Sequence, residues 1–94
     1  MTVTVFGRLF ALGQIVITRH AHNVLTSRDV NEGLIRHLEG DWGRVCESDR
    51  QLNDSAVHDG GRIMSEYCSG SGVRFWIITE YDRSVTTILL PSDY

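Results

Sequence analysis

Two histidines separated by one residue, His20 and His22, are the first side chains in the chain whose type and spacing suit a chemical role, as ligands of a metal ion. Zinc sites in proteins take three or four ligands. The other histidines, His37 and His58, and the two cysteines stand at no spacing that would complete such a set. The sequence therefore predicts no metal site, and it leaves a role for His20 and His22 open.

A second candidate chemistry is acid–base catalysis by carboxyl groups. A carboxylate pair or a Mg²⁺ site could be assembled from Asp41, Asp49, Glu80 and Asp82, and a small hydrolase could use Asp49, Asn53 and Glu80. Every acidic domain permits such a grouping. The templates with fixed spacing are absent from the sequence: the phosphate loop, the dinucleotide-binding glycine pattern, the G-x-S-x-G elbow and the C-x-x-C pair. We therefore predict no catalytic residue and no cofactor, with a small hydrolase as an alternative.

The charges and apolar runs of the chain limit its partners and its location. The 94 residues include nine arginines, no lysine and twelve acidic residues, which gives a net charge of −3. Contact with nucleic-acid phosphates needs a cationic surface, so direct nucleic-acid binding is not expected. There is no signal-peptide pattern, no apolar run near the ~18 residues of a membrane span, and too few cysteines for a disulfide framework. We expect a soluble cytoplasmic protein that does not contact a membrane.

The periodicity of the apolar residues predicts one α+β domain over residues 1–94. A β-branched run at about 12–18 predicts a short N-terminal strand. Apolar residues at helical spacing predict one helix at about 27–39, and a thinner stripe ending at two glycines predicts another at about 46–59. Residues of about 62–90 change to strand periodicity with two short turns, which predicts a three-stranded antiparallel meander packed on the two helices.

The last two predicted strands have apolar residues on both faces. Pairing Glu80 with Val85 across the turn places Phe75, Ile77, Ile88 and Leu90 on one face, and Trp76, Ile78, Val85 and Leu89 on the other. Two short helices can cover one face of a small sheet but hardly two. We therefore expect the second face to be covered by residues 1–18 or by a partner, which could be a second copy of the chain.

Residues of two turns complete the candidate interaction surface. Trp42, in "GDWG", either plugs the edge of the core or anchors an interface. In the turn "YDRS", the structural interpretation has Asp82 accepting hydrogen bonds from turn amides and Arg83 solvated, whereas the functional one makes the turn an exposed tip for partner recognition. The candidate interaction surface consists of Asp41, Trp42, Asp49, Asn53, Trp76, Ile78, Tyr81, Asp82, Arg83, Val85 and Leu89.

Four segments, "LGQIVIT", "GDWGRVCESDRQLN", "GGRIMSEY" and "FWIITEYDRSVTTILLPSDY", together resemble a family of small bacterial proteins found on plasmids, phages and other mobile DNA. Members are often labelled "plasmid-related protein" or "type I restriction endonuclease subunit M". The second label disagrees with the chemistry, because a methyltransferase needs a doubly wound cofactor-binding sheet and a proline-containing catalytic loop, and this chain has one proline. The resemblance implies a genetic setting and no catalytic residues.

These observations favour a non-enzymatic protein-binding module encoded by a mobile element. Its sharpest version is an anti-defence protein that docks on a CRISPR or restriction complex and inhibits it. The alternative to both this module and the hydrolase is a toxin, because the predicted order β-α-α-β-β-β resembles the RelE/ParE scaffold. Toxins of that kind are basic, as contact with RNA demands, whereas this chain is acidic.

Overall fold

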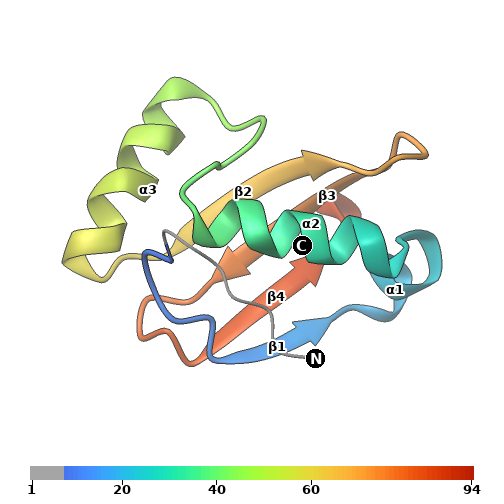
Figure 1. The fold of residues 1–94 in the computed structure, drawn as a ribbon, viewed down its shortest axis with the longest axis horizontal. Coiled ribbons are helices and arrows are strands. Elements are labelled where there is room, and N and C mark those ends of the chain that lie inside the picture. Colours follow the sequence, from blue (N-terminus) through green and yellow to red (C-terminus); the bar gives the residue numbers. More distant parts are fainter. Residues whose placement is uncertain (1–7) are drawn as a thin grey trace.

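The computed structural model describes residues 8–94, which form one sheet, three α-helices and a C-terminal 3₁₀ helix (Figure 1). Residues 1–7, which we considered as part of the cover of the second sheet face, lie outside the described residues. The predicted α+β class is confirmed. The elements in chain order are β1 (Gln14–Ile17), α1 (Arg19–Val24), α2 (Ser27–Leu38), α3 (Glu47–Asp59), β2 (Ile63–Cys68), β3 (Arg74–Thr79), β4 (Val85–Leu89) and η1 (Pro91–Asp93).

The sheet has the strand order β1-β4-β3-β2. Strands β2, β3 and β4 form the predicted antiparallel meander, and the backbone N–H of Glu80 donates to the carbonyl of Val85 at 3.0 Å, as the predicted pairing requires. The sheet nevertheless has four strands rather than three, because β1 pairs in parallel with β4. A short β-branched strand beside β4 satisfies backbone groups that an edge strand would otherwise leave open.

Helix α2 has the start that its sequence predicts. The Thr26 hydroxyl accepts from the backbone N–H of Asp29, whose carboxylate accepts from the backbone N–H of Thr26, so the two form a capping box. Gly33, inside the helix, lies against the sheet, where a Cβ atom would meet Ile77 and Phe75 at 3.0–3.1 Å. The glycine therefore allows the helix to approach the sheet closely.

Helix α3 buries most of the stripe that helical spacing predicts. Ala56 and Asn53 are buried and Asp49 is half-buried, as residues three and four apart on one face should be. Leu52, which the same spacing places on this face, is 66% exposed instead. The helix ends at Gly60, whose φ of 80° gives it a left-handed cap. The expected burial of Leu52 is wrong because Asn53 occupies the inward position of that turn.

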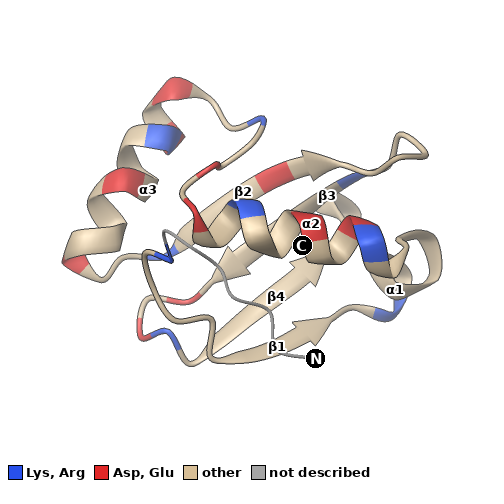
Figure 2. Ribbon diagram, in the orientation of Figure 1, with Lys and Arg blue, Asp and Glu red and all other residues tan. Residues whose placement is uncertain are grey.

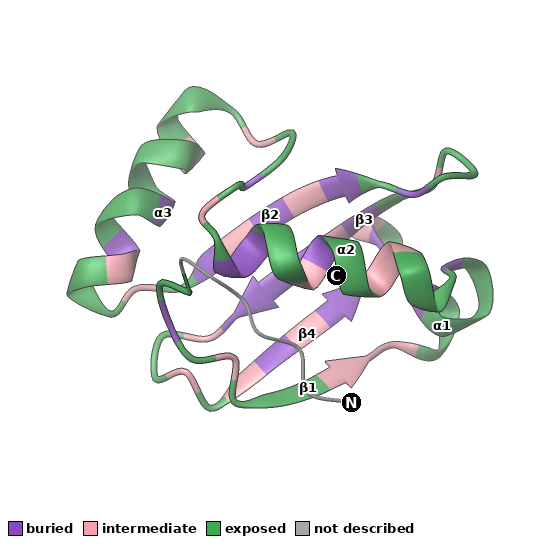
Figure 3. Cartoon of the chain, viewed as in Figure 1, coloured by how far each residue is buried: buried purple, intermediate pink, exposed green. Residues whose placement is uncertain are grey.

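All three α-helices contribute to the core on one face of the sheet or at its edge. One apolar cluster lies under α1 and α2 and includes Ala21, Phe75 and Ile88. The other lies between the end of α2 and α3 and includes Trp42 and Ala56. Figure 3 shows buried residues along β2, β3 and β4, whereas β1 at the sheet edge is exposed or half-buried. The opposite face, which we call the open face, is left without an α-helix from the described residues.

Candidate functional site

The open face carries the four apolar residues that the sequence assigned to it, but two of them are inaccessible. Ile78 and Leu89 are 2% and 6% exposed, while Trp76 and Val85 are half-buried. The C-terminus supplies part of the cover, since η1 contacts β3 and the Tyr94 ring packs against Trp76 at 5.6 Å between centroids. The sequence did not predict that the C-terminal segment, to which Thr18 donates a hydrogen bond at Asp93, would supply this cover.

A group of aromatic and charged side chains occupies the accessible part of the open face. The Tyr94 and Trp76 rings meet edge to face at 71°, and the guanidinium of Arg62 lies 5.3 Å from the centre of the Tyr94 ring and donates to its hydroxyl at 2.7 Å. Glu66 accepts from the indole N–H of Trp76 at 2.9 Å and from Arg74 at 2.8 Å. We call these five residues the aromatic patch: Arg62, Glu66, Arg74, Trp76 and Tyr94.

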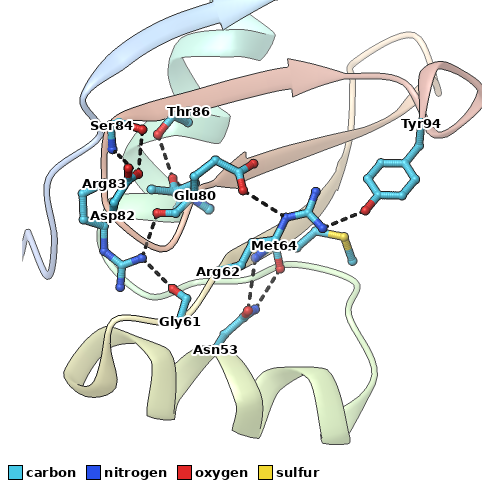
Figure 4. A network of polar contacts seen from close by, with 12 residues as sticks. Asn53, Gly61, Arg62, Met64, Glu80, Asp82, Arg83, Ser84, Thr86 and Tyr94 are labelled. Atoms are coloured by element: carbon cyan, nitrogen blue, oxygen red, sulfur yellow. Dashed lines mark hydrogen bonds and ion pairs between the residues drawn. The ribbon is translucent and has the colours of Figure 1, made fainter.

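The electrostatics of the aromatic patch are balanced. The hydrogen bond from Arg74 holds the pKa of Glu66 below its usual value, with a smaller effect of the Trp76 hydrogen bond in the same direction. Glu80 lies 3.7 Å from Arg62, which joins the patch to the network in Figure 4. Two arginines are therefore matched by two glutamates, and the aromatic rings lie between them. Such a surface can contact a protein without a strong preference for either charge.

The residues considered for a hydrolase take separate roles. The amide of Asn53 is bound at both ends by one residue, because its Nδ2 donates to the carbonyl of Met64 at 2.8 Å and its Oδ1 accepts from the N–H of Met64 at 3.1 Å (Figure 4). Glu80 pairs with Arg62, and Asp49 is half-buried on α3. Within residues 8–94, no hydrogen bond joins any two of Asp49, Asn53 and Glu80. Asn53 is thus a structural link between α3 and the edge of β2.

Replacing Asn53 with aspartate is expected to lower the free energy of unfolding by about 2–3 kcal/mol, because a carboxylate cannot donate to the Met64 carbonyl and would face it as an unpaired acceptor. Urea denaturation followed by tryptophan fluorescence measures the loss. Asn31→Asp is the matched control, since Asn31 is exposed on α2 and receives the same change of charge. Equal stability of the two variants would contradict the structural role of Asn53.

The "GDWG" turn places Trp42 in the core. Its side chain is 3% exposed, and its indole N–H donates to Asp54 at 2.9 Å. Trp42 therefore plugs the core, as one of the two interpretations predicted, and its burial keeps it from any exposed surface. Asp41 is exposed, but Arg36 binds it through two hydrogen bonds of 2.8 and 3.2 Å, and these lower the pKa of its carboxyl group.

The turn between β3 and β4 has an inward-pointing arginine at its centre. Asp82 accepts from the backbone N–H and the hydroxyl of Ser84, which confirms the structural interpretation of this residue. The expectation that Arg83 is solvated is wrong. Its guanidinium donates to the carbonyls of Gly61 at 2.6 Å and Ala56 at 2.7 Å, so it ties the turn to the end of α3. Tyr81, with 68% of its side chain exposed, is the accessible aromatic residue of the turn.

A network of buried hydrogen bonds surrounds His37, and the sequence analysis did not predict it. His37 Nδ1 lies 2.6 Å from Ser65 Oγ, and Nε2 lies 2.9 Å from Thr79 Oγ1, which is 2.7 Å from Thr86 Oγ1. Thr86 in turn donates to the carbonyl of Leu12 at 2.7 Å. Burial, with a smaller effect of the Arg83 charge, lowers the pKa of His37 to about 3. The sequence contained a signal for this network, because each of the strands β2, β3 and β4 has one hydroxyl residue on its inward face.

This Ser–His–Thr arrangement is closed to substrates, because Ser65, His37, Thr79 and Thr86 are 0% exposed.

The histidines considered as metal ligands lie near the start of α1. His20 Nδ1 lies 3.2 Å from Asp93 Oδ1, and His22 is exposed. In the described part of the chain, no three histidine, cysteine or acidic side chains gather at a distance suited to a metal ion. Cys46 and Cys68 are exposed and free.

The fold and the site define a small α+β protein with one open sheet face that carries an aromatic patch. No known family model, curated protein or solved structure matches the chain. No helix within residues 8–94 has the length and apolar character needed to cross a bilayer.

Proposed function

We propose that the protein is a non-enzymatic protein-binding module that uses the aromatic patch on its open face. The observation that carries the proposal is the edge-to-face pair of Trp76 and Tyr94, which lies with Arg62 and Arg74 on the open face. Tryptophan, tyrosine and arginine are the residues most enriched at the energetic centres of protein interfaces.

The exposure of the patch supports this use. Tyr94 is 70% exposed, and the side chains of Arg62 and Arg74 are 45% and 59% exposed. Ile78 and Leu89, on the same sheet face, are buried, and Leu89 is the β4 neighbour of Trp76, so the accessible part of this face is polar and aromatic. The bound partner is expected to present an apolar centre with both donors and acceptors at its rim.

The double variant Arg74→Glu/Tyr94→Ala is expected to weaken partner binding by about 2 kcal/mol, or roughly thirtyfold, because it removes one ring and reverses one charge of the patch. A partner captured with the wild-type chain is isolated, and its affinity for each variant is measured by titration calorimetry. The matched control is Arg28→Glu/Tyr81→Ala. Arg28 also pairs with a glutamate on the surface, and Tyr81 is as exposed as Tyr94. Equal affinities for the two double variants would contradict the proposal.

The resemblance to mobile-element proteins supports a narrower proposal, in which the partner is a restriction or CRISPR complex of the host. Expression of the wild-type chain in bacteria that carry such a system is then expected to increase phage plating, and the patch double variant is expected to lose this effect. Unchanged plating on every tested system would remove the anti-defence role but would leave the protein-binding module to be tested by affinity.

A further inference from the structure

The outer edge of β2 is closed by other parts of the chain. Asn53 binds both backbone groups of Met64, as described above. The N–H of Glu66 donates to the carbonyl of Trp42 at 3.1 Å, and the carbonyl of Glu66 accepts from the N–H of Arg44 at 2.8 Å. An edge strand with free backbone groups is a template for pairing with another chain. The backbone groups of Met64 and Glu66 are already bound, so β2 cannot pair with another strand through them.

The outer edge of β1 is open within the described residues. The N–H groups of Gln14 and Thr18 donate to carbonyls of Ser84 and Ile88 on the β4 side, at 3.0 Å each. Because backbone groups alternate in direction along a strand, the N–H and C=O of Ile15 and Ile17 point away from β4. No residue of the described range 8–94 pairs with them, and β1 is the last strand of the sheet (Figure 1).

A groove runs between this open edge and α2. Its volume is about 320 Å³, and its apolar lining comes from Ile15, Val16, Ile17, Leu25, Val30 and Ile88. None of the residues that line it is an aspartate, glutamate, lysine or arginine, and Figure 2 shows β1 without charged residues. Ile15 is 49% exposed. The groove suits the apolar side chains of an uncharged added strand, because burying a charge without a partner is costly.

We propose that β1 of a second copy of this chain pairs antiparallel with β1, so that the two sheets join into one. The strand "QIVI" is itself uncharged and apolar, and it presents two donors and two acceptors at Ile15 and Ile17. It therefore has the complementarity that the groove requires. A symmetric dimer uses the same surface twice, which an antiparallel pair of identical edge strands satisfies.

The register of the pair follows from the faces of the sheet. Two residues that face each other across an antiparallel pair point to the same side of the sheet. With a two-fold axis perpendicular to the sheet, this requires the axis to pass between the two copies of a single residue. An axis at Ile15 would pair Gly13, whose φ of 64° is not extended, and an axis at Ile17 would pair Arg19, which is in α1. The axis therefore lies at Val16. Ile15 then faces Ile17 of the second copy, and each such pair exchanges two backbone hydrogen bonds.

Ile15→Lys is expected to weaken the dimer by about a hundredfold, because the substitution removes two apolar contacts per dimer and places two charges in the joined grooves. Sedimentation equilibrium of the full chain under reducing conditions measures this over a wide range of protein concentration. The strand pair is small beside the roughly 1,600 Å² of a standard interface, so the wild-type dimer is expected at high concentration. Leu52→Lys, at an exposed leucine of α3, is the matched control. A wild-type chain that stays monomeric, or an Ile15→Lys variant that dimerises as tightly as wild type, would overturn the proposal.

A cross-link tests the register in a background with Cys46→Ser and Cys68→Ser. Val16→Cys is expected to form an intermolecular disulfide readily, because the two copies of residue 16 face each other across the axis at a Cα separation of about 4.5 Å. Ile15→Cys is expected to cross-link much more slowly, because its two copies are offset along the strands. Equal rates at the two positions would overturn the proposed pairing. The measurement needs the chain alone, so its outcome is independent of whether the aromatic patch binds a partner.

Discussion

Lowering the pH from about 7 to about 5 is expected to reduce the free energy of unfolding by about 2 kcal/mol through His37 alone. Burial lowers the pKa of this imidazole to about 3 in the folded protein, whereas an unfolded chain protonates it near its ordinary value of 6.5. The unfolded state therefore gains a proton first as the pH falls. The stability is complete above the unfolded pKa and is lost progressively as the pH drops from 6.5 toward 3.

Three carboxyl groups with lowered pKa values contribute to the pH dependence below about pH 5. Hydrogen bonds from Arg36 and Arg74 lower the pKa values of Asp41 and Glu66, respectively, and the backbone N–H groups of Thr26 and Gly70 lower that of Asp29. A carboxyl group with a lowered folded pKa contributes stability above its unfolded pKa, near 4, and loses it as the pH falls through the folded value. The loss between about pH 7 and about pH 5 therefore reports mainly on histidine.

The variant His37→Gln separates this titration from the packing of the side chain. Glutamine can keep one donor and one acceptor near Ser65 and Thr79, so we expect a less stable protein whose stability barely changes between about pH 7 and about pH 5. Urea denaturation at each pH, followed by the fluorescence of Trp42, which packs 5.8 Å from the His37 ring, measures both quantities. His58→Gln, at an exposed histidine of α3, is the control. If both variants keep the wild-type pH dependence, the assignment to His37 is wrong.

Local patterns in the sequence carried enough information for most of the fold. The capping box of α2, the glycines after α3 and the alternation of Phe75 and Ile77 each depend on neighbouring residues, and the structure contains all three features. The parallel pairing of β1 with β4 joins segments about seventy residues apart, for which no periodicity gives a signal. The N-terminal strand was predicted for its local pattern, but its place in the sheet was missed for that reason.

Side-chain roles that depend on distant partners were harder to predict. Arg83 was expected in solvent because a charged turn residue normally lies there, but two carbonyls at the end of α3 bind it. Tyr94 lies beyond the predicted end of the last strand and was assigned no role, yet its ring packs against Trp76 on the open face. Both contacts bring together segments that are separate in sequence, so they become visible only in three dimensions.

The closed edge of β2 depends on a glycine as well as on Asn53. Gly43 forms a parallel bridge with Glu66, and its φ of 73° lies in the left-handed region. A methyl group built on Gly43 would overlap the carbonyl oxygen of Glu66 and would touch the Tyr67 ring at 2.8–2.9 Å. Since the obstacle is backbone, no side-chain rotation can relieve it. Any larger residue at this position must push the "GDWG" turn away from β2.

Gly43→Ala is therefore expected to lower the free energy of unfolding by about 3 kcal/mol or more, because left-handed strain adds to the loss of the bridge. Gly72→Ala is the matched control: its φ is 89°, but a Cβ atom there would meet nothing within 4 Å, so only the strain of about 1 kcal/mol is expected. Urea denaturation measures both variants. Because the first substitution also frees the backbone of Glu66 for pairing, light scattering is expected to show faster aggregation of Gly43→Ala than of Gly72→Ala at equal fractions folded. Equal stability and equal aggregation of the two variants would show that the turn does not close this edge of the sheet.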